Sequence, residues 1–138
     1  MKKINPIVLL DNDAEELEFL EGVFGELRVP NELLYFSNGP DALQYLHTTK
    51  TQPFIIIADI NMPGMDGIEF RRQINQDKNL RRKTIPFIFL TTTATQATVE
   101  QAYDMSVQGF FEKPKTFPAM VQLMDEVYRY WSVSKRPC

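Results

Sequence analysis

Short runs of apolar residues, each followed by polar residues, recur along the whole chain. One run covers residues 54–58, shows no apolar–polar alternation, and leads directly into the carboxylate of Asp59. A run of this kind is typical of a strand that is buried on both faces of a sheet. Further apolar runs occupy residues 7–10, 33–36, 87–90 and 109–111. The pattern therefore predicts five short strands.

Amphipathic segments lie between these runs and after the last of them. Apolar residues recur every three or four positions between residues 14 and 29, which predicts a helix that ends before Pro30. Helices are also predicted at residues 41–47, 68–74, 97–105 and 120–131, and residues 77–84 are predicted to be a polar loop. Strands that alternate with helices form parallel sheets with right-handed crossovers. The expected fold class is therefore α/β, a doubly wound five-stranded parallel sheet with five helices.

Length and composition indicate one domain. The 138 residues suffice for a single core, expected at about residues 5–131, with a frayed tail at 132–138 and no output domain. The net charge of −3 is spread along the chain, so we expect no nucleic-acid partner. No apolar run approaches the roughly 20 residues that cross a bilayer. Because the single cysteine, Cys138, also excludes an intrachain disulfide, we expect a cytoplasmic protein without a membrane partner.

Chemically active side chains follow the predicted strands. Residues 11–13 (Asp-Asn-Asp), Asp59, Thr91 and Lys113 each stand at the end of an apolar run. Since the carboxyl ends of parallel strands lie along one edge of the sheet, these residues are expected to meet there. Carboxylates suit Mg²⁺, and a lysine with a hydroxyl suits phosphoryl oxygens. A zinc site is not expected, because the only histidine, His47, lies away from this edge.

Together these features resemble the receiver domain of two-component response regulators, in particular the single-domain chemotaxis regulators. The resemblance covers nearly the whole chain, and residues 59–67 (Asp-Ile-Asn-Met-Pro-Gly-Met-Asp-Gly) are similar to the family's phosphoacceptor loop. Thr91 and Lys113 fall where the family has its threonine and lysine, and residues 11–13 resemble its acidic metal-binding corner. The resemblance implies a flavodoxin-like sheet with strand order 2-1-3-4-5.

The resemblance also implies a role for each site residue. Asp59 would be the nucleophile that takes a phosphoryl group from a histidine kinase or a histidine phosphotransfer protein, giving an acyl phosphate. Mg²⁺ would neutralise charge on the phosphoryl oxygens, held by Asp11, Asn12, Asp59 and the backbone carbonyl of Asn61. Lys113 would pair first with Asp59 and then with the phosphate.

A conformational switch is implied as well. Thr91 would move towards the phosphoryl group and Phe110 would follow it inward. The bond between Lys113 and Pro114 would be cis, an isomer that proline makes accessible. The movement would remodel the face formed by the fourth helix, the fifth strand and the fifth helix. A downstream protein would bind there, and the same face is a candidate for homodimerisation.

The chain departs from the family at the metal corner. Receivers usually have two adjacent acids at this point, whereas this chain has Asp11 followed by Asn12. An amide oxygen can coordinate a metal but is neutral, so Mg²⁺ is expected to bind more weakly. Asp13 either compensates for the missing charge or caps the first helix, and the sequence leaves both roles open. We expect phosphorylation to survive with a raised Mg²⁺ requirement.

Two alternatives stand beside the active receiver. The first is a degenerate receiver that binds a partner without being phosphorylated, and Asn12 is its support. The second is an aspartate-nucleophile phosphatase of the haloacid dehalogenase type, which also has a strand that ends in Asp-x-Asp, as residues 11–13 do. That family would not explain the loop after Asp59. In the leading interpretation the protein is not an enzyme. The most activity expected of it is self-phosphorylation from a phosphodonor and autodephosphorylation.

Overall fold

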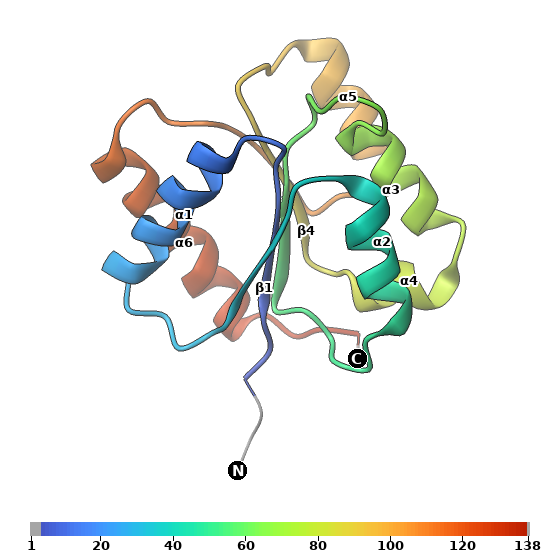
Figure 1. Cartoon of the computed structure of the whole chain (residues 1–138), viewed down its shortest axis with the longest axis horizontal. Coiled ribbons are helices and arrows are strands. Elements are labelled where there is room, and N and C mark those ends of the chain that lie inside the picture. Colours follow the sequence, from blue (N-terminus) through green and yellow to red (C-terminus); the bar gives the residue numbers. More distant parts are fainter. Residues whose placement is uncertain (1–3, 138) are drawn as a thin grey trace.

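A parallel sheet forms the centre of the computed structural model, which describes residues 4–137 (Figure 1). Its strands are β1 (Ile7–Leu10), β2 (Leu33–Phe36), β3 (Ile55–Ala58), β4 (Phe87–Thr91) and β5 (Gly109–Glu112). Their order in the sheet is β2-β1-β3-β4-β5, and every neighbouring pair is parallel. The predicted fold class and strand order are confirmed.

Helices cover both faces of this sheet. They are α1 (Ala14–Glu26), α2 (Gly39–Thr48), α3 (Gly67–Asn75), α4 (Lys78–Lys83), α5 (Gln96–Asp104) and α6 (Phe117–Val133). Figure 1 shows α1 and α6 on one face, and α2 to α5 on the other. None of the helices within residues 4–137 has the length and apolar character needed to span a membrane.

The helix count is six in the described residues, so the prediction of five was wrong. The additional helix, α4, lies in the segment that was predicted to be a polar loop. Asp77 caps it by accepting hydrogen bonds from the backbone N–H groups of Asn79 and Leu80, at 2.8 and 3.1 Å. Leu80 is its one buried residue. A single apolar position gives no helical period, so the pattern could not reveal this helix.

The C-terminal segment also differs from the expected frayed tail. Helix α6 continues to Val133, and Arg136 then folds back onto the protein. The Arg136 guanidinium donates to the backbone carbonyls of Phe54 and Trp131, and its carbon lies 4.5 Å from the centroid of the Phe54 ring. The contact between Arg136 and Phe54 joins residues 82 positions apart, so no local sequence pattern predicts it.

Side chains of the sheet fill a separate apolar layer on each face. Val8, Leu10 and Ile56 point into the layer under α2 and α3, where Phe70 and Phe87 pack with ring centroids 6.0 Å apart. Neighbouring positions of the same strands point to the opposite layer, under α1 and α6. Strands β1, β3 and β4 are buried along their whole length, as runs without alternation predict. The polar ends of these strands therefore stand on a rigid base.

A charged side chain, Arg71, lies inside the layer beneath α3. It is 1% exposed. Its Nε and Nη2 atoms donate to the carbonyls of Met105 and Ser106 at 3.1 and 3.2 Å, and Nη1 donates to Thr84 Oγ1 at 3.2 Å. Its guanidinium carbon lies 4.9 Å from the Phe87 centroid. Burial lowers the pKa of Arg71 to about 10, so the group remains charged at neutral pH and ties α3 to the end of α5.

We predict that Arg71→Met lowers the free energy of unfolding by about 2 kcal/mol, because the carbonyls of Met105 and Ser106 and the buried hydroxyl of Thr84 each lose a charged donor. Urea denaturation measures this change. Arg72→Met is the matched control, since Arg72 is exposed and pairs only with Glu69 within its own helix. Its cost should stay below about 0.5 kcal/mol. Equal losses in the two variants would contradict a special role for the buried guanidinium.

Candidate functional site

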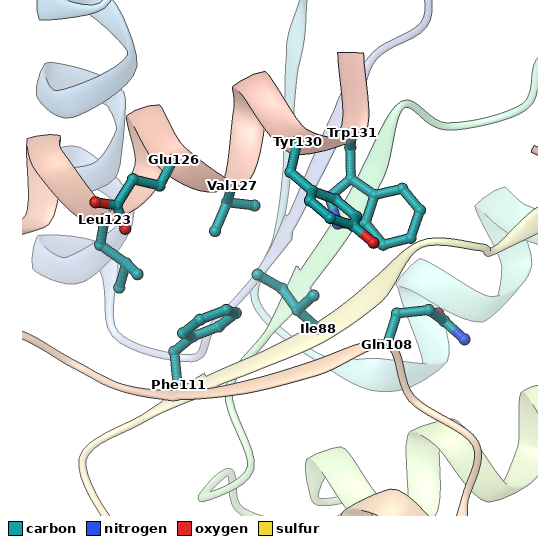
Figure 2. Close-up of a pocket in the computed structure, with 8 residues that line it drawn as sticks. All are labelled: Ile88, Gln108, Phe111, Leu123, Glu126, Val127, Tyr130 and Trp131. Carbon is teal, nitrogen blue, oxygen red and sulfur yellow. The ribbon is translucent and has the colours of Figure 1, made fainter. Parts of the chain in front are cut away.

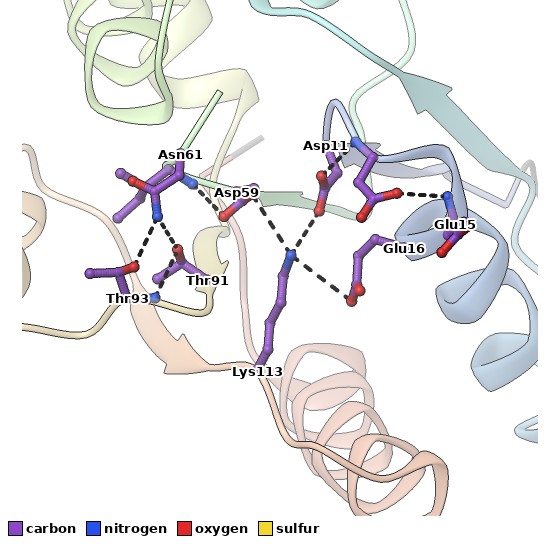
Figure 3. Close-up of polar contacts among 10 residues, drawn as sticks. Asp11, Glu15, Glu16, Asp59, Asn61, Thr91, Thr93 and Lys113 are labelled. Atoms are coloured by element: carbon purple, nitrogen blue, oxygen red, sulfur yellow. Dashed lines mark hydrogen bonds and ion pairs between the residues drawn. The ribbon is translucent and has the colours of Figure 1, made fainter. Parts of the chain in front are cut away.

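The chemically active residues meet at one edge of the sheet, as predicted. Asp11 follows β1, Asp59 follows β3, Thr91 ends β4 and Lys113 follows β5. Figure 3 shows Asp11, Asp59 and Thr91 around the long side chain of Lys113. The backbone N–H of Lys113 donates to the carbonyl of Thr91 at 2.8 Å, which sets the point from which the lysine reaches the carboxylates.

The ammonium of Lys113 lies among carboxylates. Its Nζ atom is 2.9 Å from Asp11 Oδ2 and 3.7 Å from Asp59 Oδ2. The Asp11 and Asp59 residues are only 4% and 8% exposed. Burial by itself lowers the pKa of Lys113. The hydrogen bond that the ammonium donates to Asp11 and the charges of Asp11, Asp59 and Glu16 outweigh that effect, so the pKa of Lys113 is raised and the lysine stays charged.

Glu16 is a site residue that the sequence analysis missed. Its Oε1 atom lies 4.0 Å from Lys113 Nζ, and its side chain is 23% exposed. Its pKa is raised, first by burial and then by the charges of Asp11, Asp13 and Asp59, although Lys113 opposes these effects. A glutamate in the first turn of a helix ordinarily indicates stabilisation of the helix dipole, so the sequence held no separate signal for this contact.

The two oxygens of Asp59 have different surroundings. Oδ1 accepts a hydrogen bond from the backbone N–H of Ile60 at 2.8 Å. Oδ2 faces Lys113 Nζ at 3.7 Å, which is an ion pair but too long for a hydrogen bond. Oδ2 is therefore the less restrained oxygen, with a lone pair available for attack on an electrophile.

The hydroxyl of Thr91 is engaged on the other side of Asp59. The side-chain amide of Asn61 donates to Thr91 Oγ1 at 3.4 Å and to Thr93 Oγ1 at 3.2 Å. Thr91 itself is fully buried. Phe110 lies on the neighbouring strand, half-buried, with its ring 6.2 Å from that of Phe89. The structure thus places Asn61 and Thr91 together and puts Phe110 on the side towards α5.

The corner at residues 11–13 and the adjacent loop that begins at Asp59 contain oxygen donors of the kind that Mg²⁺ prefers. Asp11 and Asp59 both face the same ammonium, and Asn61 follows closely in the loop. Within residues 4–137, no three His, Cys, Asp or Glu side chains form a ready-made metal cage. Mg²⁺ typically takes one or two carboxylates and keeps several waters, so Asp11, Asp59 and the Asn61 carbonyl fit it.

Asp13 is a helix cap, which settles one of the open roles. Its Oδ1 atom accepts from the backbone N–H of Glu15 at 3.0 Å, at the start of α1. Its own N–H donates to Asp11 Oδ1 at 2.9 Å, which orients that carboxylate. Asn12, between them, is exposed.

Close backbone contact holds the loop after Asp59 in place. The N–H of Gly67 donates to the carbonyl of Ile60 at 2.8 Å. A Cβ atom at Gly67 would lie 2.2 Å from the Asp59 carbonyl oxygen, closer than any real contact. Asp66 then caps α3 by accepting from the N–H of Glu69 at 2.8 Å. The glycine is therefore required for α3 to start directly against the site.

The cis peptide bond of the described residues lies at Ile85–Pro86, so the implied cis bond at Lys113–Pro114 was wrong. Any bond before a proline adopts the cis form at small cost. The sequence alone therefore does not distinguish one such bond from another.

Comparison with known proteins decides the family. The family model of the response regulator receiver domain matches residues 7–125 of this chain. This chain belongs to the response regulator receiver domain family. Chemotaxis protein CheY-3 of Vibrio cholerae is 30% identical over 129 residues, covering 93% of this chain and 95% of CheY-3.

Two solved structures share the fold of this receiver domain. The phosphorylated cyanobacterial phytochrome response regulator RcpA has a TM-score of 0.85 at 22% identity. The alignment covers 98% of this chain and 100% of the RcpA chain. The Mn²⁺-bound form of response regulator Rcp1 has a TM-score of 0.84 at 22% identity, with the same coverage. Divalent metal binding and phosphorylation are thus found among receivers of this fold.

A separate apolar groove of about 480 Å³ lies between the sheet and α6, away from the strand tips (Figure 2). Its walls come from β4, β5 and α6, with Gln108 at one end. The lining residues are Ile88, Gln108, Phe111, Leu123, Glu126, Val127, Tyr130 and Trp131. Tyr130 is 62% exposed, so an aromatic ring faces solvent beside this groove.

We predict that Gly67→Ala lowers the free energy of unfolding of the receiver by about 3 kcal/mol, because its methyl group would collide with the backbone at Asp59. Thermal or urea unfolding measures this change. Gly25→Ala is the matched control, since no atom lies within 4 Å of its added Cβ and alanine favours a helix. The control should be stabilised by up to about 1 kcal/mol. A Gly67 variant as stable as the wild type would show that α3 can shift without cost.

Proposed function

We propose that this receiver domain is an active phosphoacceptor, phosphorylated on Asp59 with Mg²⁺. The observation that carries the proposal is the position of the Asp59 side chain, which stands at a strand end with Oδ2 3.7 Å from the Lys113 ammonium. Because Oδ1 accepts the hydrogen bond from Ile60, Oδ2 is the oxygen available to an electrophile, and a cation lies beside it to receive phosphoryl charge. The donor is a histidine kinase or a histidine phosphotransfer protein, and the reaction takes place in the cytoplasm.

The side chains of this domain that the transfer uses are already at the strand ends. Asp59 Oδ2 forms a bond to phosphorus while the bond from phosphorus to the donor's imidazole nitrogen breaks, and the electron pair leaves with that nitrogen. Asp11, Asp59 and the carbonyl of Asn61 would hold Mg²⁺, which supplies neutralisation of the phosphoryl oxygens. Lys113 shifts from the Asp11 carboxylate towards the new phosphoryl oxygens. Asp59 itself carries the phosphoryl group at the end of the step, so we propose a signalling role for the domain and not catalytic turnover.

The phosphoryl group then biases a conformational equilibrium. Phosphorylation replaces the carboxylate charge of −1 on Asp59 with a phosphoryl charge of about −2 and brings three strong acceptor oxygens. The Thr91 hydroxyl, now contacted by Asn61, gains a better acceptor, and Phe110 follows into the space beside Thr91. The face formed by α5, β5 and α6 changes shape and binds a downstream protein or a second copy of this chain. These elements are the fourth helix, fifth strand and fifth helix of the sequence prediction, renumbered because α4 is additional. The apolar groove beside β5 and α6 supports contacts through this region.

The contacts of Asp13 favour this proposal over the phosphatase alternative. That alternative drew on the Asp-x-Asp run at residues 11–13, and the Asp13 carboxylate of this run caps α1 by accepting from the N–H of Glu15. The degenerate receiver remains the second candidate, because Asn12 removes one formal charge from the metal corner.

The first test is intact-protein mass after incubation with acetyl phosphate or phosphoramidate, with and without Mg²⁺. We expect the wild type to gain one phosphoryl group only when Mg²⁺ is present. Asp59→Asn is the matched control and should gain none. A gain of equal size in that variant would contradict the assignment of Asp59, and no gain in the wild type at high Mg²⁺ would favour the degenerate receiver.

The Asn12 position generates a second prediction. Asn12→Asp should lower the Kd for Mg²⁺ about tenfold, since it restores a unit charge next to a divalent ion. Titration of Mg²⁺ followed by NMR shifts of the amides near residues 59–61 gives both Kd values. The phosphorylation rate of Asn12→Asp should saturate at correspondingly lower Mg²⁺. Identical Kd values in the two proteins would disprove the view that the amide weakens the metal corner.

A further inference from the structure

The metal corner of this receiver lacks one acid, and another acid lies close to the site. Asn12 is neutral, whereas Glu16 points its carboxylate at Lys113 from the first turn of α1 (Figure 3). We propose that Glu16 is a positioning residue that supplies the missing negative charge of the corner, acting through Lys113 and solvent. This proposal rests on the proposed function, because it concerns Mg²⁺ at the same site.

The contacts of Lys113 indicate how Glu16 acts. The ammonium now has Asp11 as its closest partner, at 2.9 Å, with Glu16 at 4.0 Å. The Asp11 carboxylate cannot serve a lysine and a divalent cation equally well. Were Asp11 to hold a divalent cation, Glu16 would remain beside Lys113 as a counter-ion. The lysine therefore stays directed into the site, and the balance of charge there is preserved.

The charge count supports this role. Asp11 and Asp59 bring two negative charges to the site and Lys113 brings one positive charge, so these three groups leave a net charge of −1. Glu16 makes that net charge −2, which an acid at position 12 would otherwise have done.

The alternative for Glu16 is a purely structural one. Acidic residues in the first turn of a helix interact with its dipole. Glu15 does this as well, since it stands in the same turn of α1. Glu15 is exposed, and the described residues include no ion pair between it and Lys113. The two residues therefore share the helix contribution and differ in their relation to the site.

The test compares Mg²⁺ binding by the full chain of four proteins. They are the wild type, Glu16→Gln, Glu15→Gln, and Glu16→Gln combined with Asn12→Asp. NMR titration with MgCl₂ gives each Kd without any phosphoryl donor, and thermal unfolding confirms that each variant is folded. Glu16→Gln should raise the Kd about fivefold, as expected for the loss of one unit charge beside a divalent-cation site that is partly solvated. Glu15→Gln should change it less than about twofold.

The double variant tests whether the two positions are equivalent in charge. Asn12→Asp should return the Kd of Glu16→Gln to that of the wild type or below it. Equal Kd values for Glu16→Gln and Glu15→Gln would overturn the proposal, even where the wild type accepts a phosphoryl group on Asp59 and the proposed function stands. A wild type that binds no Mg²⁺ would overturn both. A fivefold effect in a wild type that is never phosphorylated would support Glu16 and reject the proposed function.

Discussion

The ion pair between Lys113 and the two strand-end carboxylates is the interaction on which the site depends. Asp11 and Asp59 are almost entirely buried, and two buried negative charges side by side would be unstable without a cation between them. Lys113 Nζ lies 2.9 Å from one carboxylate and 3.7 Å from the other, so it neutralises part of that charge. The negative charge that remains is what makes the site suitable for a divalent cation. In the proposed phosphotransfer, the same Lys113 ammonium would contact the phosphoryl oxygens.

The rest of the fold serves to hold these groups in register. Three neighbouring strands are buried on both faces, so their ends cannot move independently of the core. Gly67 allows α3 to start against the Asp59 carbonyl, and Asp13 starts α1 beside Asp11. The helix α5 is attached differently. Only Ala102 of its residues is buried, and its C-terminal end is held by Arg71, which donates to the carbonyl of Met105. This attachment is compatible with the conformational change that we propose near Thr91.

The local pattern of the chain determined the fold and the main site residues. Uninterrupted apolar runs specify strands buried on both faces, and the alternation with helices specifies a parallel sheet. A parallel sheet brings its strand ends to one edge, so Asp11, Asp59, Thr91 and Lys113 followed from topology without any knowledge of contacts. The resemblance to receivers supplied their roles.

Only the tertiary structure decided the features that depend on contacts between distant segments. Glu16 became a site residue because α1 packs beside Lys113, which follows it by 97 positions in the sequence. The sequence left open whether Asp13 compensates for the missing charge or caps α1, and the hydrogen bond that it accepts from the N–H of Glu15 shows the cap. Arg71, Arg136 and the helix α4 were likewise invisible, because a buried cation, a tail that folds back and a helix with one apolar residue leave no periodic signal. Periodicity reports which face of an element is buried, whereas partners are set by how the elements pack.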